Sequence, residues 1–480
     1  MKKILFVGAE VMPFAATGGL GDVMGSLPAA LKAKNKGNVD VRVILPLYAS
    51  VGEEWRAQMK DEVIFNFNLS WRYVYCGIKS LVKDGVTYYF VDNEYYFKRD
   101  RLYGFFDDGE RYAYFSKAVL EALIRLGFYP DVLHANDWQS ALSVVYLNTK
   151  YRHIDGFKNT KTVYTIHNIE YQGQYSFSIL GDVFDLGDDV YSLMRYDDCI
   201  NLTKAAIECA DKVSTVSPRY AQEIRTPEYS HKLHHVFDRN AHKLCGILNG
   251  IDYNYYNPAK DQVLAKNFDR RNTISGKKEN KLALQRAYGL PERADVPMLA
   301  IISRLAAHKG LDLVAEIADD VVRNHDVQLV ILGKGEAHFE SFFYELERRH
   351  PDKVRALLTY DRDLSKRIYA ACDMFVMPSR SEPCGLSQMI ASRYGAVPIV
   401  RETGGLYDSI KGYWVDNGEI KGNGFTFANY SSYELRDRIE AALALYADAP
   451  MFKKFVSKIT GTDFSWASSA EKYMEMYNSL

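Results

Sequence analysis

Short runs of apolar, often β-branched residues recur along the chain, and each is followed by a turn and a helix-length stretch with one apolar face. This alternation predicts parallel sheets covered by helices. Strands are predicted at residues 4–7, 41–45, 132–134, 163–166 and 213–216, and again at residues 298–303, 327–332, 356–360, 374–377 and 397–400. The pattern therefore predicts an α/β protein of two doubly wound, Rossmann-like domains that face a central cleft, with ligands bound at the carboxyl ends of the strands.

The two runs of strands are separated by a region without a strand-like pattern, which holds Asn249-Gly250, Asn257-Pro258 and a charged tract at residues 277–281. The domain junction is placed near residue 250, which gives an N-terminal domain at 1–250 and a second domain from residue 251. A length of 480 residues leaves ample material for two cores.

Composition excludes several classes of function. The formal net charge of −1 gives no field that would attract nucleic acid or an anionic membrane, and no apolar stretch has the length of a membrane-spanning helix. The six cysteines are scattered without a C-x-x-C pair, which is typical of reduced thiols in a cytoplasmic protein. We expect neither a metal site nor a cofactor.

Two strand ends in the second half carry candidate ligand-binding groups. The run at 374–378 ends at Ser379-Arg380-Ser381-Glu382-Pro383-Cys384-Gly385-Leu386, which places a carboxylate beside the free N–H groups of a predicted helix start. Such a point can hold a hydroxyl and a phosphate together, and a sugar nucleotide carries both. Arg304 and Lys309 follow the strand at 298–303 and suit a diphosphate, with two solvated surface cations as the alternative.

The first half has a glycine-rich turn and two further motifs at strand ends. The turn, Thr17-Gly18-Gly19-Leu20-Gly21-Asp22, lacks the G-x-G-x-x-G spacing of a nicotinamide site, so it either approaches an anion or serves packing alone. The segments 134–139 and 165–168 and residue Glu10 all lie at predicted strand ends, which favours a site over isolated core groups. Their histidines and acids do not recur at a metal-ligand interval.

Taken together, these motifs resemble the bacterial glycogen synthase and plant starch synthase family. The matches are TGGLGDV at 17–23, HANDWQS at 134–140, TIHNIEYQG at 165–173, TVSPRYAQEI at 215–224, ILNGID at 247–252, SRLAAHKGLDL at 303–313, PSRSEPCGLSQ at 378–388, TGGL at 403–406 and DFSW at 463–466. They occur in the family's order over nearly the whole chain.

The resemblance implies a GT-B glucosyltransferase that moves glucose from ADP-glucose to the non-reducing end of an α-1,4-glucan with retention of configuration. It implies a second domain at 251–459 that binds the donor, a first domain on the glucan side, and a segment at 460–480 whose helix crosses back to the first domain. No metal, nucleic acid or membrane is implied.

The resemblance also assigns roles to residues. Arg304 and Lys309 would hold the diphosphate, and Glu382 would bind glucose hydroxyls. His167 would hold the 6-hydroxyl and present its backbone carbonyl to the anomeric face. Asp137 and Glu10 would shape the glucose and acceptor side. Further substrate contacts are expected at Thr17, Gly18, Gly19, Asn168, Asn249, Tyr360, which stacks the base, Cys384, Gly385, Leu386 and Thr403.

Two positions depart from the family's pattern. Ala16 stands where members commonly have Lys directly before the glycine turn, and Asn136 stands where many bacterial members have His. The first departure leaves open a transferase that uses UDP-glucose or a small sugar acceptor, and a catalytically impaired glucan-binding or regulatory paralogue. The presence of Arg304, Lys309, Glu382 and His167 argues against an inactive copy.

Overall fold

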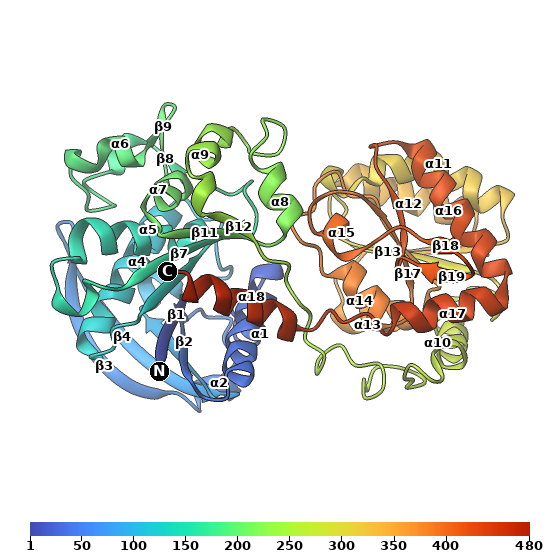
Figure 1. Ribbon diagram of the computed structural model, residues 1–480, viewed down its shortest axis with the longest axis horizontal. Helices are drawn as coiled ribbons and strands as arrows, with labels where there is room; N and C mark the ends of the chain where they lie inside the picture. Colours follow the sequence, from blue (N-terminus) through green and yellow to red (C-terminus); the bar gives the residue numbers. More distant parts are fainter. The chain divides into compact units, whose positions relative to one another are not determined.

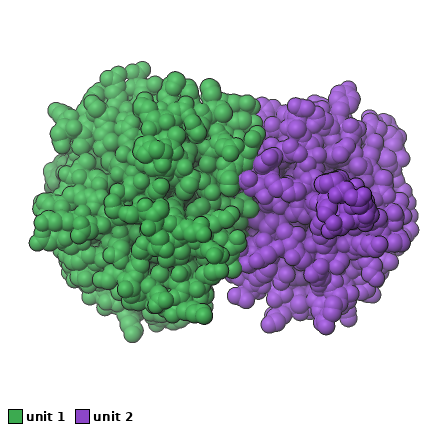
Figure 2. Space-filling view, in the orientation of Figure 1, with its two compact units in different colours: residues 1–250, 466–480 green, residues 251–465 purple.

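The computed structural model describes residues 1–480 and divides the chain into two compact units, drawn as a ribbon in Figure 1 and in two colours in Figure 2. Unit 1 comprises Met1–Gly250 and Trp466–Leu480, and unit 2 comprises Ile251–Ser465. Each unit is built on one large sheet whose strands alternate with helices, the α/β architecture that the spacing of apolar runs predicts.

The sheet of unit 1 has nine strands in the order β12-β11-β7-β6-β1-β2-β5-β4-β3. Pairing is parallel from β12 to β5, and β4 and β3 continue the sheet as an antiparallel edge. The strands are β1 (Lys2–Val7), β2 (Val39–Pro46), β3 (Lys60–Leu69), β4 (Arg72–Lys83), β5 (Val86–Asp92), β6 (Val132–Asn136), β7 (Lys161–Ile166), β11 (Lys212–Thr215) and β12 (Leu244–Gly246). A separate small sheet joins β8 (Gln174–Tyr175), β9 (Arg195–Tyr196) and β10 (Cys199–Asn201).

The helices of unit 1 include one from the far end of the sequence. They are α1 (Gly19–Lys34), α2 (Glu53–Arg56), α3 (Glu94–Phe97), α4 (Asp108–Arg125), α5 (Trp138–Tyr146), α6 (Tyr191–Met194), α7 (Leu202–Cys209), α8 (Pro218–Glu223), α9 (His234–Arg239) and α18 (Trp466–Asn478). Helix α18 packs against α1, and the ammonium of Lys2 donates to the carbonyl of Tyr477 at 2.7 Å. The last helix is therefore part of unit 1.

The sheet of unit 2 is parallel throughout, in the order β15-β14-β13-β16-β17-β20. Its strands are β13 (Met298–Ile302), β14 (Gln328–Leu332), β15 (Val354–Leu357), β16 (Met374–Met377), β17 (Val397–Arg401) and β20 (Phe425–Phe427), and a hairpin is formed by β18 (Trp414–Asp416) and β19 (Glu419–Lys421). The helices are α10 (Thr273–Tyr288), α11 (Leu311–Asn324), α12 (Ala337–Arg349), α13 (Arg362–Ala371), α14 (Ser387–Arg393), α15 (Gly404–Ser409), α16 (Ser432–Ala447) and α17 (Ala449–Ile459).

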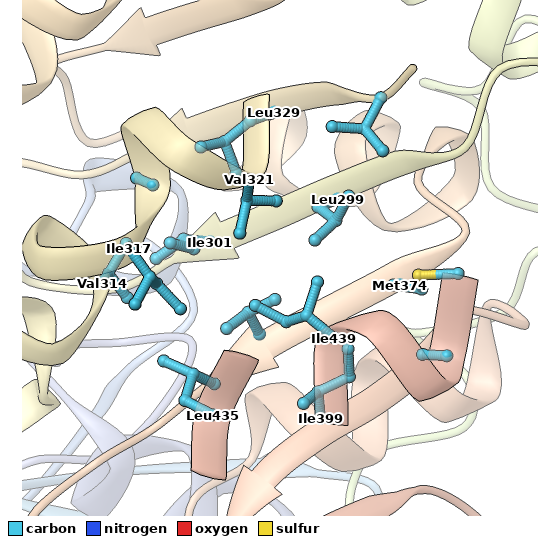
Figure 3. Packing of buried hydrophobic residues seen from close by; sticks show 14 of the residues in the cluster. Leu299, Ile301, Val314, Ile317, Val321, Leu329, Met374, Ile399, Leu435 and Ile439 are labelled. Carbon is cyan, nitrogen blue, oxygen red and sulfur yellow. The ribbon is translucent and has the colours of Figure 1, made fainter. Parts of the chain in front are cut away.

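The core of unit 2 lies where α11 and α16 cover the sheet, as Figure 3 shows. Helix α11 places Val314, Ile317 and Val321 on one face because residues three and four apart lie on the same side of a helix. These side chains and Ile439 of α16 pack on Leu299 of β13. This packing anchors the strands whose carboxyl ends carry the candidate site.

The sequence pattern misplaced one strand of unit 2 and did not predict the burial of a lysine. The expected strand at 356–360 is β15, Val354–Leu357, so Tyr360 lies beyond the strand end. The charged tract at 277–281, which follows the junction predicted near residue 250, lies in α10 of unit 2, where the ammonium of Lys277 donates to the carbonyls of Tyr369 and Tyr394. Its charge is compatible with a buried position because the three carbonyls of Tyr369, Ala370 and Tyr394 accept hydrogen bonds from the ammonium.

Candidate active site

The site in unit 2 lies at the point where its strand order reverses. Counted along the chain, the six parallel strands are arranged 3-2-1-4-5-6, so the first strand, β13, lies beside the fourth, β16. Open sheets of this kind bind ligands in the crevice outside the carboxyl ends of these two strands. The segments that follow them are Ser303 to Gly310 and Ser379 to Glu382, which are the segments that the sequence singles out.

A cation and a carboxylate from these two segments form an ion pair. Lys309 Nζ lies 2.7 Å from Glu382 Oε2, and their side chains are only 16% and 9% exposed. The hydroxyl of Ser379 donates to the same carboxylate oxygen at 3.0 Å. The pair therefore brings together two of the predicted residues, separated by 73 positions, and holds opposite charges side by side at the switch point.

Glycines let the neighbouring turns approach Glu382 closely. Gly404 has a φ of +43°, and a Cβ there would lie 2.0 Å from the carbonyl oxygen of Glu382. Gly405, whose N–H donates to that carbonyl at 3.0 Å, would place a Cβ 2.0 Å from the carbonyl oxygen of Cys384. The start of α15, which follows the buried Thr403, thus packs against the backbone of Glu382 and Cys384. Only glycine fits at positions 404 and 405.

The other predicted donor residues of unit 2 lie on its surface or at a short helix start. Arg304 is exposed, and its guanidinium forms no ion pair within the protein. Tyr360 is 75% exposed and accepts a hydrogen bond from Arg362 Nε at 2.9 Å. Gly385 has a φ of +70°, and Leu386 is the N-cap residue of α14. These residues contact neither Lys309 nor Glu382 through a hydrogen bond, so the structure leaves their grouping around a ligand as a prediction.

In unit 1 Glu10 binds the glycine-rich turn. Its carboxylate accepts from the N–H of Thr17 at 2.6 Å, from the N–H of Gly18 at 3.1 Å and from the hydroxyl of Thr17 at 2.8 Å. The phenol of Tyr103 also donates to it. Both carboxylate oxygens are engaged, so Glu10 holds the turn in place at the start of α1, whose first residue is Gly19. Tyr103 has no motif in the sequence and is brought here by the fold alone.

Asp137 and His167 meet at the ends of adjacent parallel strands. The backbone N–H of His167 donates to Asp137 Oδ1 at 2.7 Å, and the N–H of Asp137 donates to the carbonyl of Thr165 at 2.9 Å. Asp137 has a φ of +58° and a ψ of 175°, a combination that is almost confined to glycine. Strain of this kind, about 1 to 3 kcal/mol, persists where the surrounding bonds fix the residue, and it is common at functional sites.

Burial is the largest influence on the pKa values of Asp137 and His167. It raises the pKa of Asp137 to about 7, against the opposing effect of the His167 N–H, and the nearby charge of Glu10 raises it further. Burial lowers the pKa of His167 to about 3, so its imidazole is neutral at physiological pH. The unit therefore presents a neutral imidazole and a carboxyl group that changes charge near pH 7, which is the range suited to hydrogen-bonding and proton-handling roles.

The remaining predicted residues of unit 1 have different surroundings. Asn168 Oδ1 accepts from the N–H of Glu170 at 3.0 Å and caps a turn. Asn249 is only 6% exposed, and its side-chain oxygen has no hydrogen-bond partner in the protein. His134 lies inside the unit, where its Nδ1 bonds the hydroxyl of Tyr477 of α18 at 2.7 Å. His134 is thus a core residue that fastens the last helix.

No three His, Cys, Asp or Glu side chains gather in an arrangement that could hold a metal ion. None of the helices combines the length and the apolar character that crossing a membrane requires.

The two doubly wound units match families of glycosyltransferases, so the chain is in the class of two-domain α/β glycosyltransferases. Residues 3–239 match the family model for the starch synthase catalytic domain, and residues 288–458 match that for glycosyl transferases group 1. The chain belongs to the glycogen synthase and starch synthase family.

Relatives of known name match the chain over its full length. It is 46% identical over 480 residues to a glycogen synthase of Ligilactobacillus salivarius, with 100% of both chains covered. It is 45% identical to a glycogen synthase of Streptococcus pneumoniae, with 100% of this chain and 99% of the relative covered.

Solved structures agree with the family and the fold. The catalytic domain of starch synthase IV from Arabidopsis thaliana, bound to ADP and acarbose, matches with a TM-score of 0.89 at 36% identity, covering 100% of this chain and 99% of that one. A sucrose-phosphate synthase from Thermosynechococcus elongatus matches with a TM-score of 0.59 at 17% identity over the same shares, which shows a common fold.

Proposed function

We propose that this protein is a retaining glucosyltransferase that moves glucose from ADP-glucose to the non-reducing end of an α-1,4-glucan, as in glycogen or starch synthesis. Membership of the glycogen and starch synthase family supports glucosyl transfer for glucan synthesis. The choice of ADP-glucose is supported by the related plant starch synthase, which was solved with ADP. The observation that carries the proposal is the Lys309–Glu382 pair at the switch point of unit 2.

In this proposal unit 2 binds the donor. Lys309 and Arg304 hold the diphosphate and stabilise the negative charge that grows on the leaving nucleotide as the glycosidic bond breaks, which makes their contribution largest in the transition state. Glu382 accepts hydrogen bonds from glucose hydroxyls. The N–H groups at Gly385 and Leu386 add phosphate contacts, and the exposed ring of Tyr360 stacks on the base.

Unit 1 supplies the groups around the glucose and the acceptor. His167 holds the 6-hydroxyl of the glucose and presents its backbone carbonyl to the anomeric face. Asp137 and Asn249 provide hydrogen-bonding oxygens, and the unpartnered oxygen of Asn249 supports a role in binding. Glu10 acts through the turn at Thr17 and Gly18, because both of its oxygens are bonded there.

The mechanism follows from which groups carry charge. No candidate residue stands out as a covalent nucleophile, and the carboxylates of Glu10, Asp137 and Glu382 each accept a hydrogen bond from the protein. A front-face reaction, in which the leaving phosphate helps to take the acceptor proton while the acceptor oxygen attacks the anomeric carbon, needs no such nucleophile. It differs in this from the two-carboxylate arrangement of retaining glycosidases.

The decisive experiment measures nucleotide release by the purified protein with ADP-glucose or UDP-glucose, each with and without a glucan primer. Primer-dependent release of ADP is the expected result. Turnover with neither donor would refute a glucosyltransferase, primer-independent release would refute glucan as the acceptor, and a preference for UDP-glucose would refute the donor assignment alone.

A second arm tests the departure at position 16. Ala16→Lys restores the cation that family members commonly carry before the glycine turn, and we expect a lower donor KM because an added cation favours a diphosphate. A matched Ala16→Gln variant adds a side chain of similar reach without the charge and is expected to leave the KM unchanged. Equal values for both variants would contradict a role for charge at this position.

A further inference from the structure

Asn136 is the last residue of β6 and joins three neighbouring strands through its side chain. It is 1% exposed, and its Nδ2 donates to the carbonyls of Val7 at 3.3 Å and His134 at 3.1 Å. Its Oδ1 lies 3.0 Å from Nε2 of His167, which follows β7. The amide thus connects the ends of β1, β6 and β7 at the carboxyl edge of the sheet.

The direction of these bonds assigns the proton on His167. Two carbonyl oxygens can only accept hydrogen bonds, so the side of the Asn136 amide that faces Val7 and His134 must be the NH₂ group. The side that faces His167 is then the oxygen, which is an acceptor only. The ring nitrogen 3.0 Å away must therefore carry the hydrogen, which makes His167 an Nε2–H imidazole.

The other ring nitrogen is left as an acceptor. Nδ1 of His167 forms no hydrogen bond with the protein, while the backbone N–H of His167 is held by Asp137. Because burial lowers the pKa of His167 to about 3, the ring does not gain a second proton in the physiological range. Residues 136 and 137 of one strand end thus bind the side chain and the backbone of the same histidine.

We infer that Asn136 is a positioning residue that fixes His167 in the Nε2–H tautomer, so that Nδ1 is a permanent hydrogen-bond acceptor for a hydroxyl of the bound sugar. This inference rests on the proposed function for the identity of the ligand, and on the protein alone for the tautomer. A hydroxyl can donate to a neutral Nδ1, and the same nitrogen with a proton would face it as a second donor. The tautomer therefore determines which hydroxyl orientation the site accepts.

The test reads the tautomer directly in the full chain labelled with ¹⁵N-histidine, through long-range ¹H–¹⁵N correlations between pH 5.5 and 8. The His167 signals are assigned by their loss in His167→Gln. We expect a neutral Nε2–H pattern that does not change over this range. A neutral Nδ1–H pattern, or a cationic ring at pH 7, would overturn the inference whether or not the protein transfers glucose.

Variants separate positioning from general stability. Asn136→Leu removes the acceptor and is expected to give mixed or inverted tautomers with a loss of roughly tenfold to a hundredfold in kcat/KM, the range for a lost buried hydrogen bond. Asn136→Asp, which burial between two carbonyls favours in its protonated form, keeps a donor toward Val7 or His134 and an acceptor oxygen toward Nε2, so it is expected to keep the Nε2–H tautomer. An unchanged tautomer in Asn136→Leu, or a lost one in Asn136→Asp, would contradict the assignment.

Thr165→Val is the matched control. Thr165 lies on the neighbouring strand, is fully buried, and its hydroxyl bonds His134 Nε2 and the hydroxyl of Ser214, both at 2.5 Å, but forms no hydrogen bond with His167. It should destabilise the same sheet edge through the loss of a buried hydroxyl while leaving the His167 signals in place. A change of tautomer in this control would show that the ring responds to loosening of the sheet and would remove the specific role of Asn136. Absence of turnover with every sugar nucleotide, together with the expected tautomer, would refute the proposed function and not the assignment.

Discussion

The ion pair between Lys309 and Glu382 allows a quantitative test of the site in unit 2. The two charged atoms lie 2.7 Å apart, and both side chains are less than one fifth exposed, at 16% and 9%. Lys309→Met removes the cation at nearly constant length, and Glu382→Gln removes the charge of the carboxylate while keeping its shape. The four proteins of this double-mutant cycle isolate the interaction between the two side chains.

The geometry sets the expected magnitude. At an effective dielectric constant of about 20, two charges at 2.7 Å attract by about 6 kcal/mol. The cycle cancels the cost of removing each group from water, while relaxation around the variants weakens the measured attraction, so we expect a coupling free energy of about 1 to 3 kcal/mol. Ser379 continues to donate to residue 382 in every variant, since its hydroxyl lies 3.0 Å from Oε2 and an amide oxygen can also accept.

The measurements are urea unfolding, followed by circular dichroism, and primer-dependent turnover. The control cycle uses Arg286 and Glu292, whose 2.6 Å pair is 69% and 43% exposed, and which should couple much more weakly because water screens it. Glu382→Gln should lower turnover by roughly a hundredfold or more, the size of a lost transition-state contact. Equal coupling in the two cycles would refute the effect of burial, and near-normal turnover of Glu382→Gln would refute its place in the site.

Three further predictions concern pH, backbone space and the core. The pKa of Asp137 is raised to about 7 from a usual 3.8, so the protonated carboxyl stabilises the fold below about pH 4 and this contribution is lost as the pH rises through 7. The shift corresponds to about 4 kcal/mol, which screening at this half-buried side chain reduces to about 1 to 2 kcal/mol. Asp137→Asn should therefore flatten the decline of the free energy of unfolding with pH, as measured by urea titrations. Gly404→Ala should destabilise unit 2 by more than about 2 kcal/mol and abolish turnover, because its Cβ would meet the Glu382 carbonyl, while Gly418→Ala, also at positive φ but in open space, should cost about 1 kcal/mol and leave turnover intact. Ile439→Ala should lower the free energy of unfolding by about 2 to 5 kcal/mol through the cavity it leaves between α16 and the sheet, as measured by urea unfolding.

The alternation of apolar runs and helix-length segments predicted the two α/β units because parallel strands are buried on both faces. Strands such as Met374–Met377 are wholly apolar and bounded by polar turns, and the structure confirms that boundary. The antiparallel edge of unit 1, β3 and β4, was not predicted: the exposed face of β4 carries Tyr73 and Tyr75, which breaks the simple polar-out alternation. The burial of Lys277 was not predicted either, because nothing in a charged tract of the sequence shows that its ammonium lies among backbone carbonyls.

The sequence predicted which residues of the candidate site carry chemical groups, but it did not predict which residues those groups contact. Motif order brought Lys309 and Glu382 to notice, but their contact depends on strand order, which apolar periodicity does not determine. The binding of Glu10 by Tyr103 joins residues 93 positions apart and has no local signal. The strain at Asp137 is likewise invisible in the sequence, since aspartate occurs freely at helix starts with ordinary backbone angles.

The contacts of Glu10, Asp137 and Asn136 share a physical logic. The carboxylate of Glu10 holds the backbone of the turn before α1, while on the next strand end the carboxylate of Asp137 holds a backbone N–H and the amide of Asn136 holds a ring nitrogen of the same residue, His167. A strained backbone at Asp137 is maintained because bonds from both sides determine it. At these positions the direction of each hydrogen bond is therefore more important than the charge of the side chain. Asn136 shows this most clearly. Its neutral amide has two donors and one acceptor in a fixed orientation, and so it specifies which nitrogen of His167 carries the proton. An ionised side chain, which only accepts or only donates, would do this at a larger desolvation cost.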